Sequence, residues 1–181
     1  MNRLALALVL CLPLSFAARA ADITVGGQTM APGKDIIDNT LNSKDHTTLV
    51  TAVKAAGLVE TLKGKGPFTV FAPTNEAFAA LHAGAVDDLL KPENKQQLTR
   101  VLTYHVVPRK LDFAAISQAI KSGNGTASFK TVAGDPLTAS MNGPRNIVLT
   151  DESGGMASIS TYDVYQSNGV IQVIDRVLMP K

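Results

Sequence analysis

Residues 68–78 read FTVFAPTNEAF, and they decide the expected fold because they place a short strand directly before a helix. Aromatic and β-branched residues at 68–72 favour a strand, which Pro73 ends. Thr74 is then a suitable N-cap for a helix over residues 75–81, with Glu76 in the first turn where the helix dipole favours an anion. We expect the Asn75 amide to bind main-chain groups at this helix start.

Before this strand, the sequence predicts helices. Apolar residues at helical spacing follow Asp45, which is a plausible N-cap, and Gly57 is a plausible stop. A second helical turn is expected over residues 58–62, and glycines and Pro67 then mark a turn. Residues 21–35 are rich in polar and turn-forming residues, and we expect them to form a leader that packs at only a few points.

After the helix at 75–81, two more helical pieces are expected, one around residues 86–90 and one that begins near Pro92. Residues 104–107, YHVV, are compact and β-favouring and predict a strand closed by Pro108. On a strand, Tyr104 and His105 would point to opposite faces. Asp112 is expected to cap a further helix that ends near Gly123.

From about residue 125 the apolar period changes to two, which predicts short strands joined by turns. The expected strands cover residues 126–132, 137–141, 147–149 and 156–159. Asn168-Gly169 is the strongest hairpin signal in the chain, and residues 170–178 would form the closing strand. Helices gathered in the first half and antiparallel strands in the second predict an α+β fold.

The first twenty residues resemble a cleaved signal peptide. Asn2 and Arg3 precede an apolar run over residues 4–16, and Ala18-Arg19-Ala20 offers small residues at the spacing of a cleavage site. The run is shorter than the ~20 residues that a helix needs to cross a bilayer. We therefore expect export to the periplasm or the extracellular space, with no membrane insertion after cleavage. Residues 36–181 would form one domain after the leader.

The composition of the mature chain excludes several functions. The full chain has 17 basic and 15 acidic side chains. Removal of Arg3 and Arg19 with the signal leaves 15 of each, so the chain lacks the basic surplus that nucleic-acid binding requires. The single cysteine, Cys11, also leaves with the signal. Disulfides, a thiolate nucleophile and cysteine-based metal sites are therefore not expected.

No motif for catalysis, for a cofactor or for a metal stands out. The three histidines, His46, His82 and His105, are far apart in sequence and form no metal-binding pair. No serine lies in the turn typical of hydrolases. The acidic neighbours 87–88 and 151–152 are expected to be solvated. The sequence thus offers no enzyme motif, and no cofactor is expected. An exported hydrolase whose residues converge only in space is left as a third alternative.

Three segments together resemble the fasciclin domain family. Residues 69–78, TVFAPTNEAF, resemble its first signature, residues 102–107, LTYHVV, its central Tyr-His motif, and residues 168–175, NGVIQVID, its closing segment. They occur in the order of the family, and the resemblance extends from about residue 36 to 180. Gln172 departs from the pattern, because many members carry histidine at this position.

The resemblance implies an α+β fold, namely a wedge-shaped antiparallel β-sandwich with flanking α-helices. It also implies an extracellular or cell-surface adhesion module without enzymatic activity. The expected partner is a cell-surface or matrix protein or polysaccharide, and weak self-association is a further expectation. The candidate interaction or structural residues are Tyr104, His105, Asn75, Asn168 and Gly169. The alternative function is a soluble binding protein for a small apolar or saccharide ligand, held in a cleft between helices and sheet.

Overall fold

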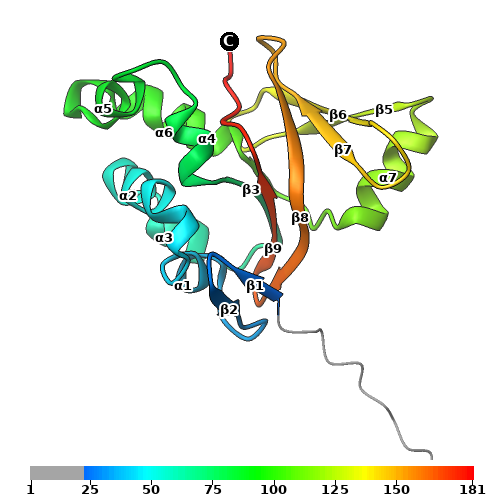
Figure 1. Ribbon diagram of the computed structural model, residues 1–181, viewed down its shortest axis with the longest axis horizontal. Coiled ribbons are helices and arrows are strands. Elements are labelled where there is room, and N and C mark those ends of the chain that lie inside the picture. Colours follow the sequence, from blue (N-terminus) through cyan, green and yellow to red (C-terminus); the bar gives the residue numbers. More distant parts are fainter. Residues whose placement is uncertain (1–22) are drawn as a thin grey trace, which may run out of the picture.

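The structure is a computed structural model that describes residues 23–181 (Figure 1). The predicted signal peptide at residues 1–20 lies outside the described residues. The helical elements are α1 (Ile36–Thr40), η1 (Lys44–His46), α2 (Thr47–Ala56), α3 (Val59–Lys63), α4 (Asn75–Ala79), α5 (Ala85–Leu90), η2 (Pro92–Asn94), α6 (Lys95–Tyr104) and α7 (Phe113–Ser122). The strands are β1 (Ile23–Val25), β2 (Gln28–Met30), β3 (Phe68–Pro73), β4 (Val106–Val107), β5 (Thr126–Lys130), β6 (Pro136–Met141), β7 (Ile147–Thr150), β8 (Met156–Gln166) and β9 (Gly169–Ile174).

One seven-stranded sheet, in the order β4-β3-β9-β8-β7-β6-β5, organises the molecule. In Figure 1 helices α1 to α6 gather on one side of the central strands, and α7 lies with β5, β6 and β7 on the other. The long strand β8 connects the two parts, and its register with β9 shifts on both sides of Thr161. Such irregularities bend a strand and increase its twist. The α+β fold predicted from the sequence is confirmed.

The pairing of β3 with β9 is parallel, whereas every other pairing in this sheet is antiparallel. Phe68 lies opposite Gly169, and the register continues to Pro73 opposite Ile174. A parallel pair needs a long crossover. Here the crossover includes α4 to α7 and strands β4 to β8. Only antiparallel strands were expected from the sequence, because a run of hairpins in the second half gives no sign of this return to β3.

Strand β3 is buried on both faces and takes part in two apolar cores. Val70 and Ala72 belong to the core beneath helices α1 to α6, and Phe71 belongs to the core of the strands β5 to β9 and α7. Strand β9 divides in the same way, with Ile171 in the first core and Ile174 in the second. A continuous apolar run is typical of a strand covered on both sides.

The helix caps predicted at Thr74 and Asp112 are confirmed. The Thr74 hydroxyl accepts from the Ala77 amide at 3.2 Å, and the Asp112 carboxylate accepts from the Ala115 amide at 2.8 Å. The cap predicted at Asp45 is wrong. Residues 44–46 form the turn η1, and α2 begins at Thr47 without a side-chain cap from the residue before it.

The first turn of α2 is capped by Asn75, which comes from a different helix. The Asn75 side-chain oxygen accepts from the Thr48 amide at 3.0 Å, and its amide group donates to the Lys44 carbonyl at 2.8 Å. Asn75 was expected to bind main-chain groups at the start of its own helix. It binds those at the start of α2 instead, so this expectation is wrong. A cap contributed from another part of the chain cannot be recognised from local sequence.

Tyr104 and His105 do not lie on a strand, contrary to the sequence analysis. Helix α6 continues to Tyr104, His105 follows as its C-cap, and β4 contains only Val106 and Val107. The helix persists because Val101 and Tyr104 are both buried, each in one of the two cores, and tertiary packing outweighs the β-propensity of the segment.

The hairpin between β8 and β9 is present, but its two-residue loop is Ser167-Asn168, because Gln166 pairs with Gly169. The predicted turn at Asn168-Gly169 is therefore shifted by one residue. Asn168 uses its side chain elsewhere: it accepts from the Ile36 amide at 3.0 Å and donates to the Leu62 carbonyl at 2.8 Å. Its hydrogen bonds tie the hairpin to α1 and to the end of α3.

Gly169 is required by the close approach of β3. A methyl group on Gly169 would overlap the main-chain oxygen of Phe68. We predict that Gly169→Ala separates the start of β3 from β9 and lowers the free energy of unfolding by at least about 2 kcal/mol. Gly33→Ala is the matched control, since nothing lies near its added methyl group, and it should shift stability by less than about 0.5 kcal/mol. Urea unfolding followed by circular dichroism measures both, and equal midpoints would contradict the prediction.

Candidate functional site

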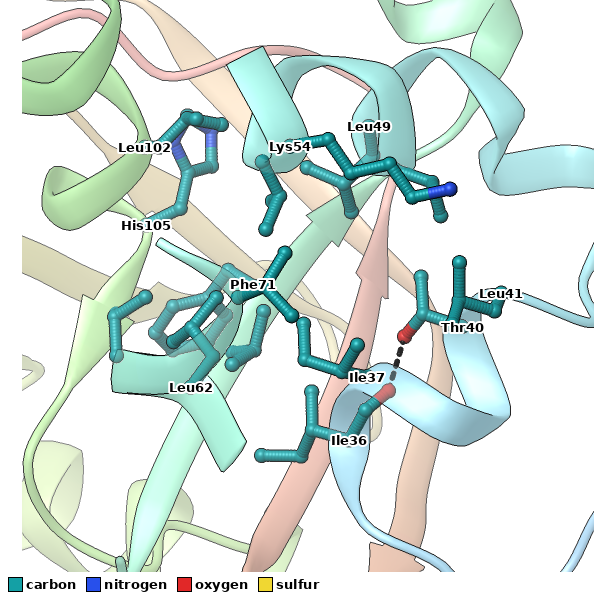
Figure 2. Close-up of a pocket in the computed structure, with 15 residues that line it drawn as sticks. Ile36, Ile37, Thr40, Leu41, Leu49, Lys54, Leu62, Phe71, Leu102 and His105 are labelled. Carbon is teal, nitrogen blue, oxygen red and sulfur yellow. Dashed lines mark hydrogen bonds between the residues drawn. The ribbon is translucent and has the colours of Figure 1, made fainter. Parts of the chain in front are cut away.

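An apolar pocket lies between α1, α2, α3 and the central strand β3. Figure 2 shows Ile36, Ile37 and Leu41 on one side and Leu49 on the other, with Phe71 and Leu62 further along the wall. The end of α6 completes the pocket with Leu102 and His105. The lining therefore joins segments that are far apart in the sequence, from residue 36 to residue 106.

The polar groups of this lining are largely used inside the protein. The Thr40 hydroxyl donates to the Ile36 carbonyl at 2.6 Å, which Figure 2 shows as a dashed line. Lys54 is the lining residue whose polar group is not used in this way. It is an exposed residue of α2, and its amine lies at the edge of the lining residues drawn in Figure 2. No ion pair involves Lys54 within residues 23–181. The pocket thus combines an apolar interior with one cation at its rim.

The open space inside the pocket is small. It amounts to about 50 Å³, whereas an engineered cavity of about 150 Å³ binds benzene. Leu41 is 43% exposed beside it, which is high for a leucine. The pocket as it stands has room for no more than the end of an alkyl chain or one small aliphatic side chain.

Tyr104 points into the other core and is fully buried. Its hydroxyl donates to the Pro136 carbonyl at 2.9 Å and accepts from the Glu152 amide at 3.3 Å. Burial raises the pKa of Tyr104 to about 12, so the phenol stays protonated at any physiological pH. Tyr104 therefore joins the start of β6 to the turn after β7, which lie at the same end of this antiparallel pair.

His105 is buried between α6 and the C-terminal segment. Its Nε2 accepts from the Leu178 amide at 3.0 Å, so the proton must lie on Nδ1, which donates to the Val101 carbonyl at 2.8 Å. Burial lowers the pKa of His105 to about 4. The imidazole is thus neutral, in a fixed tautomer, and fully used by main-chain partners.

Asp151 fixes the same C-terminal segment from the other side. One carboxylate oxygen accepts from the Ser153 and Gly155 amides, and the other accepts from the Met179 amide at 2.9 Å. Asp151 is buried, so the expectation that residues 151–152 are solvated is wrong for this residue. An acidic pair before a glycine-rich turn gave no sign that a distant chain end would cover its first residue.

Gln172, which departs from the histidine pattern of the family that the sequence resembles, is completely buried. Its oxygen accepts from the Asp163 amide at 3.0 Å, and its nitrogen donates to the Leu111 carbonyl and to the Asp163 carboxylate, both at 3.0 Å. An uncharged side chain therefore satisfies this site without any change of protonation.

The candidate residues named from the sequence do not form one surface. Tyr104 faces the strand core, while His105 contacts the apolar pocket. Asn75 caps α2, and Asn168 ties the β8–β9 hairpin to the helices. Among the candidates expected from the sequence, only His105 lines the pocket. The exposed pair Leu41 and Lys54 was missed, because neither residue stands out in a local pattern.

Within the described part of the chain, no group of three or more histidine, cysteine or acidic side chains could hold a metal ion. In the same part, no helix has the length and apolar character to cross a bilayer.

Comparison with known proteins is consistent across sequence and structure. The family model of the fasciclin domain matches residues 44–180. Protein sll1483 of Synechocystis sp. is 45% identical over 145 residues, which are 80% of this chain and 73% of that protein. The transforming growth factor-beta-induced protein ig-h3 of Sus scrofa is 34% identical over 149 residues, which are 82% of this chain and 20% of that protein. A solved FAS1 domain pair from the insect cell adhesion molecule fasciclin I shares the fold, with a TM-score of 0.71 and 16% identity over 81% of this chain and 51% of that chain.

The neutral state of His105 makes stability depend on pH. In the unfolded chain its pKa is about 6.5, but in the fold it is about 4. Protons therefore bind the unfolded chain first, and the free energy of unfolding decreases as the pH falls from about 6.5 to about 4, by about 3 kcal/mol for this residue. Burial lowers the pKa of His46 as well, so His46 acts in the same direction.

We predict that His105→Ala lowers the free energy of unfolding by about 1–3 kcal/mol at pH 7.5, because the Leu178 amide loses its acceptor. The gap between variant and wild type should close as the pH approaches 4, where the wild type has lost this contribution. Thermal unfolding across the pH range measures the gap, with exposed His82→Ala as control. A gap that stays constant with pH would show that the imidazole is not held neutral.

Proposed function

Because the chain belongs to the fasciclin domain family, we propose that it is an exported, non-enzymatic interaction module that acts in cell adhesion or matrix binding through its surface. The proposal rests on one observation: the signature residues of the family are occupied by hydrogen bonds inside the protein. Tyr104, His105, Asn75 and Asn168 all bind main-chain groups inside the protein. Their hydrogen bonds maintain a rigid body, and recognition is left to exposed residues around it.

The relatives support the same class of function. Fasciclin I, which shares this fold, is named as an insect cell adhesion molecule. The signal-like segment at residues 1–20 supports export. The partner proposed for this chain is a protein or polysaccharide of a cell surface or matrix.

Adhesion by one small domain requires two attachments. Weak self-association, or a partner that is already fixed to the surface, would supply the second. Linked weak contacts commonly raise apparent affinity by about 10²–10⁴ when the geometry permits both.

The experiment uses beads coated with residues 21–181 and presented to the producing cells and to their matrix polysaccharide. We expect saturable attachment that depends on the fold, because recognition requires an ordered surface. Beads coated with heat-unfolded protein are the control. Attachment no stronger than this control would overturn the adhesion function.

The apolar pocket favours a second candidate function, the binding of a small ligand with an alkyl end and an anionic group. Its interior would accept the alkyl end, and Lys54 at the rim would face the anion. The pocket lining contains no acidic side chain. Such a ligand would have to be slim, or the partly exposed Leu41 would have to move, because the free space is about 50 Å³.

Octanoate is a suitable probe for this second candidate. Titration followed by amide NMR should shift signals of α1 and α2, and Lys54→Gln should weaken binding at least about fivefold, through loss of the charge contact. Lys121→Gln removes an exposed charge on α7 and should leave binding unchanged. If octanoate shifts no signals of the pocket, the small-ligand function is excluded for this class of compound.

A further inference from the structure

The two edge strands of the seven-stranded sheet, β4 and β5, approach each other at one end. There the Val132 amide donates to the Val106 carbonyl at 2.7 Å, and the Ala133 amide to the Thr103 carbonyl at 3.3 Å. Beyond this junction the edges separate. The space between β5 and residues 107–111 forms an open groove of two adjoining parts, of about 650 and 480 Å³. Arg109, Ser128 and Phe129 line both parts, so the groove is continuous.

The edge of β5 presents unused main-chain groups to this groove. The Thr131 amide donates to the Asp135 carbonyl, so this residue faces β6 with its main chain. In an antiparallel pair the direction of the main-chain groups alternates. Ser128 and Lys130 therefore turn their amide and carbonyl groups to the groove, as does Thr126, whose amide reaches the Gly123 carbonyl. Within residues 23–181, no hydrogen-bond partner occurs for the amides of Ser128 and Lys130 outside the strand ladder.

The charge of the groove has one sign. Arg109 and Lys130 lie on its two walls, both are exposed, and neither forms an ion pair within the described residues. Lys110 also lines the second part of the groove, with its amine 4.7 Å from the centre of the Tyr165 ring. No acidic side chain lines either part. This local excess stands out in a chain whose mature form has equal numbers of acidic and basic residues.

We propose that this groove binds an extended acidic segment of a partner protein, which adds a strand to the free edge of β5. The inference deepens the proposed interaction function and rests on it. Strand addition uses main-chain hydrogen bonds for affinity and alternate side chains for selection. A lysine on an edge strand also prevents unselective pairing, so Lys130 would admit an acidic strand and reject apolar or basic ones.

The direction of the Lys130 main chain determines which residues of the partner strand would be acidic. We place the partner strand antiparallel to β5, so its residue opposite Lys130 turns its own amide and carbonyl to β5, because the main chain of Lys130 points to the groove. Paired residues of neighbouring strands project their side chains on the same face of the sheet. The acidic residues are therefore the ones whose amides donate to β5. The residues between them point to the face where Phe129 is buried.

The probe is the capped peptide TEVEVET, added to the full mature protein and followed by amide NMR and calorimetry. We expect the amides of Ser128 and Lys130 to shift and to become protected from hydrogen exchange. N-methylation of the three glutamates removes the donors that face β5 and should weaken binding at least tenfold. N-methylation of the two valines should leave the affinity within about threefold. The basic peptide TKVKVKT should not bind.

Charge-reversal variants test the walls of the groove. Arg109→Glu and Lys130→Glu should each weaken binding of the peptide at least tenfold. Lys95→Glu makes the same charge change at an exposed position of α6 and should change the affinity by less than twofold. Thermal unfolding verifies that the variants are folded. Equal loss for both N-methylated peptides, or tight binding of polygalacturonate without protection of the β5 amides, would overturn strand addition in favour of a polyanion site.

The same variants separate this inference from the adhesion function. If coated beads attach and Arg109→Glu beads attach equally well, adhesion stands and the groove is not its docking surface. If the peptide binds as expected but no beads attach, the groove stands and adhesion falls. Absence of any peptide-induced shift at β5 would overturn the inference regardless of the result with beads.

Discussion

The parallel pairing of β3 with β9 is the constraint on which the rest of the structure depends. It brings residue 68 next to residue 169, and both strands then contribute alternate side chains to the two apolar cores. Gly169 permits the approach, because any larger residue would meet Phe68. Asn168 secures the same end by its bonds to α1 and α3. Asn168 and Gly169, the first two residues of the closing sequence signature, therefore join the helical part of the molecule to the strand part.

A common logic links the other signature residues. Each is a polar side chain that satisfies main-chain groups of a different segment: Asn75 those of α2, Tyr104 those of the β6 and β7 loops, and His105 that of the C-terminal segment. Buried amide and carbonyl groups without partners are costly. Such residues permit a domain with irregular connections to remain rigid without disulfides. The charges of exposed residues, including those that line the groove beside β5, can then vary without loss of these internal hydrogen bonds.

The sequence predicts much of the local structure and little of what joins it. The helix caps at Thr74 and Asp112 were predictable because the cap and its target are neighbours. The parallel strand pair, the capping of α2 by Asn75 and the burial of Asp151 were not, since each depends on a segment far away in the chain. Local patterns indicated an α+β fold, and the family resemblance added the expectation of a β-sandwich with flanking helices. The apolar pocket and the basic groove could not be predicted, because their linings are assembled from separate segments.

The position of β9 in the chain order also bears on how the protein is made. Until residues 169–174 are available, β3 has no parallel neighbour, and each core lacks part of its wall. Pairings over such separations are slow to form, because the intervening loop must be closed first. A growing polypeptide therefore cannot complete either core until its last strand has been made. For the exported chain proposed above, the late strand would keep the polypeptide incompletely folded until nearly all of it is available for transport.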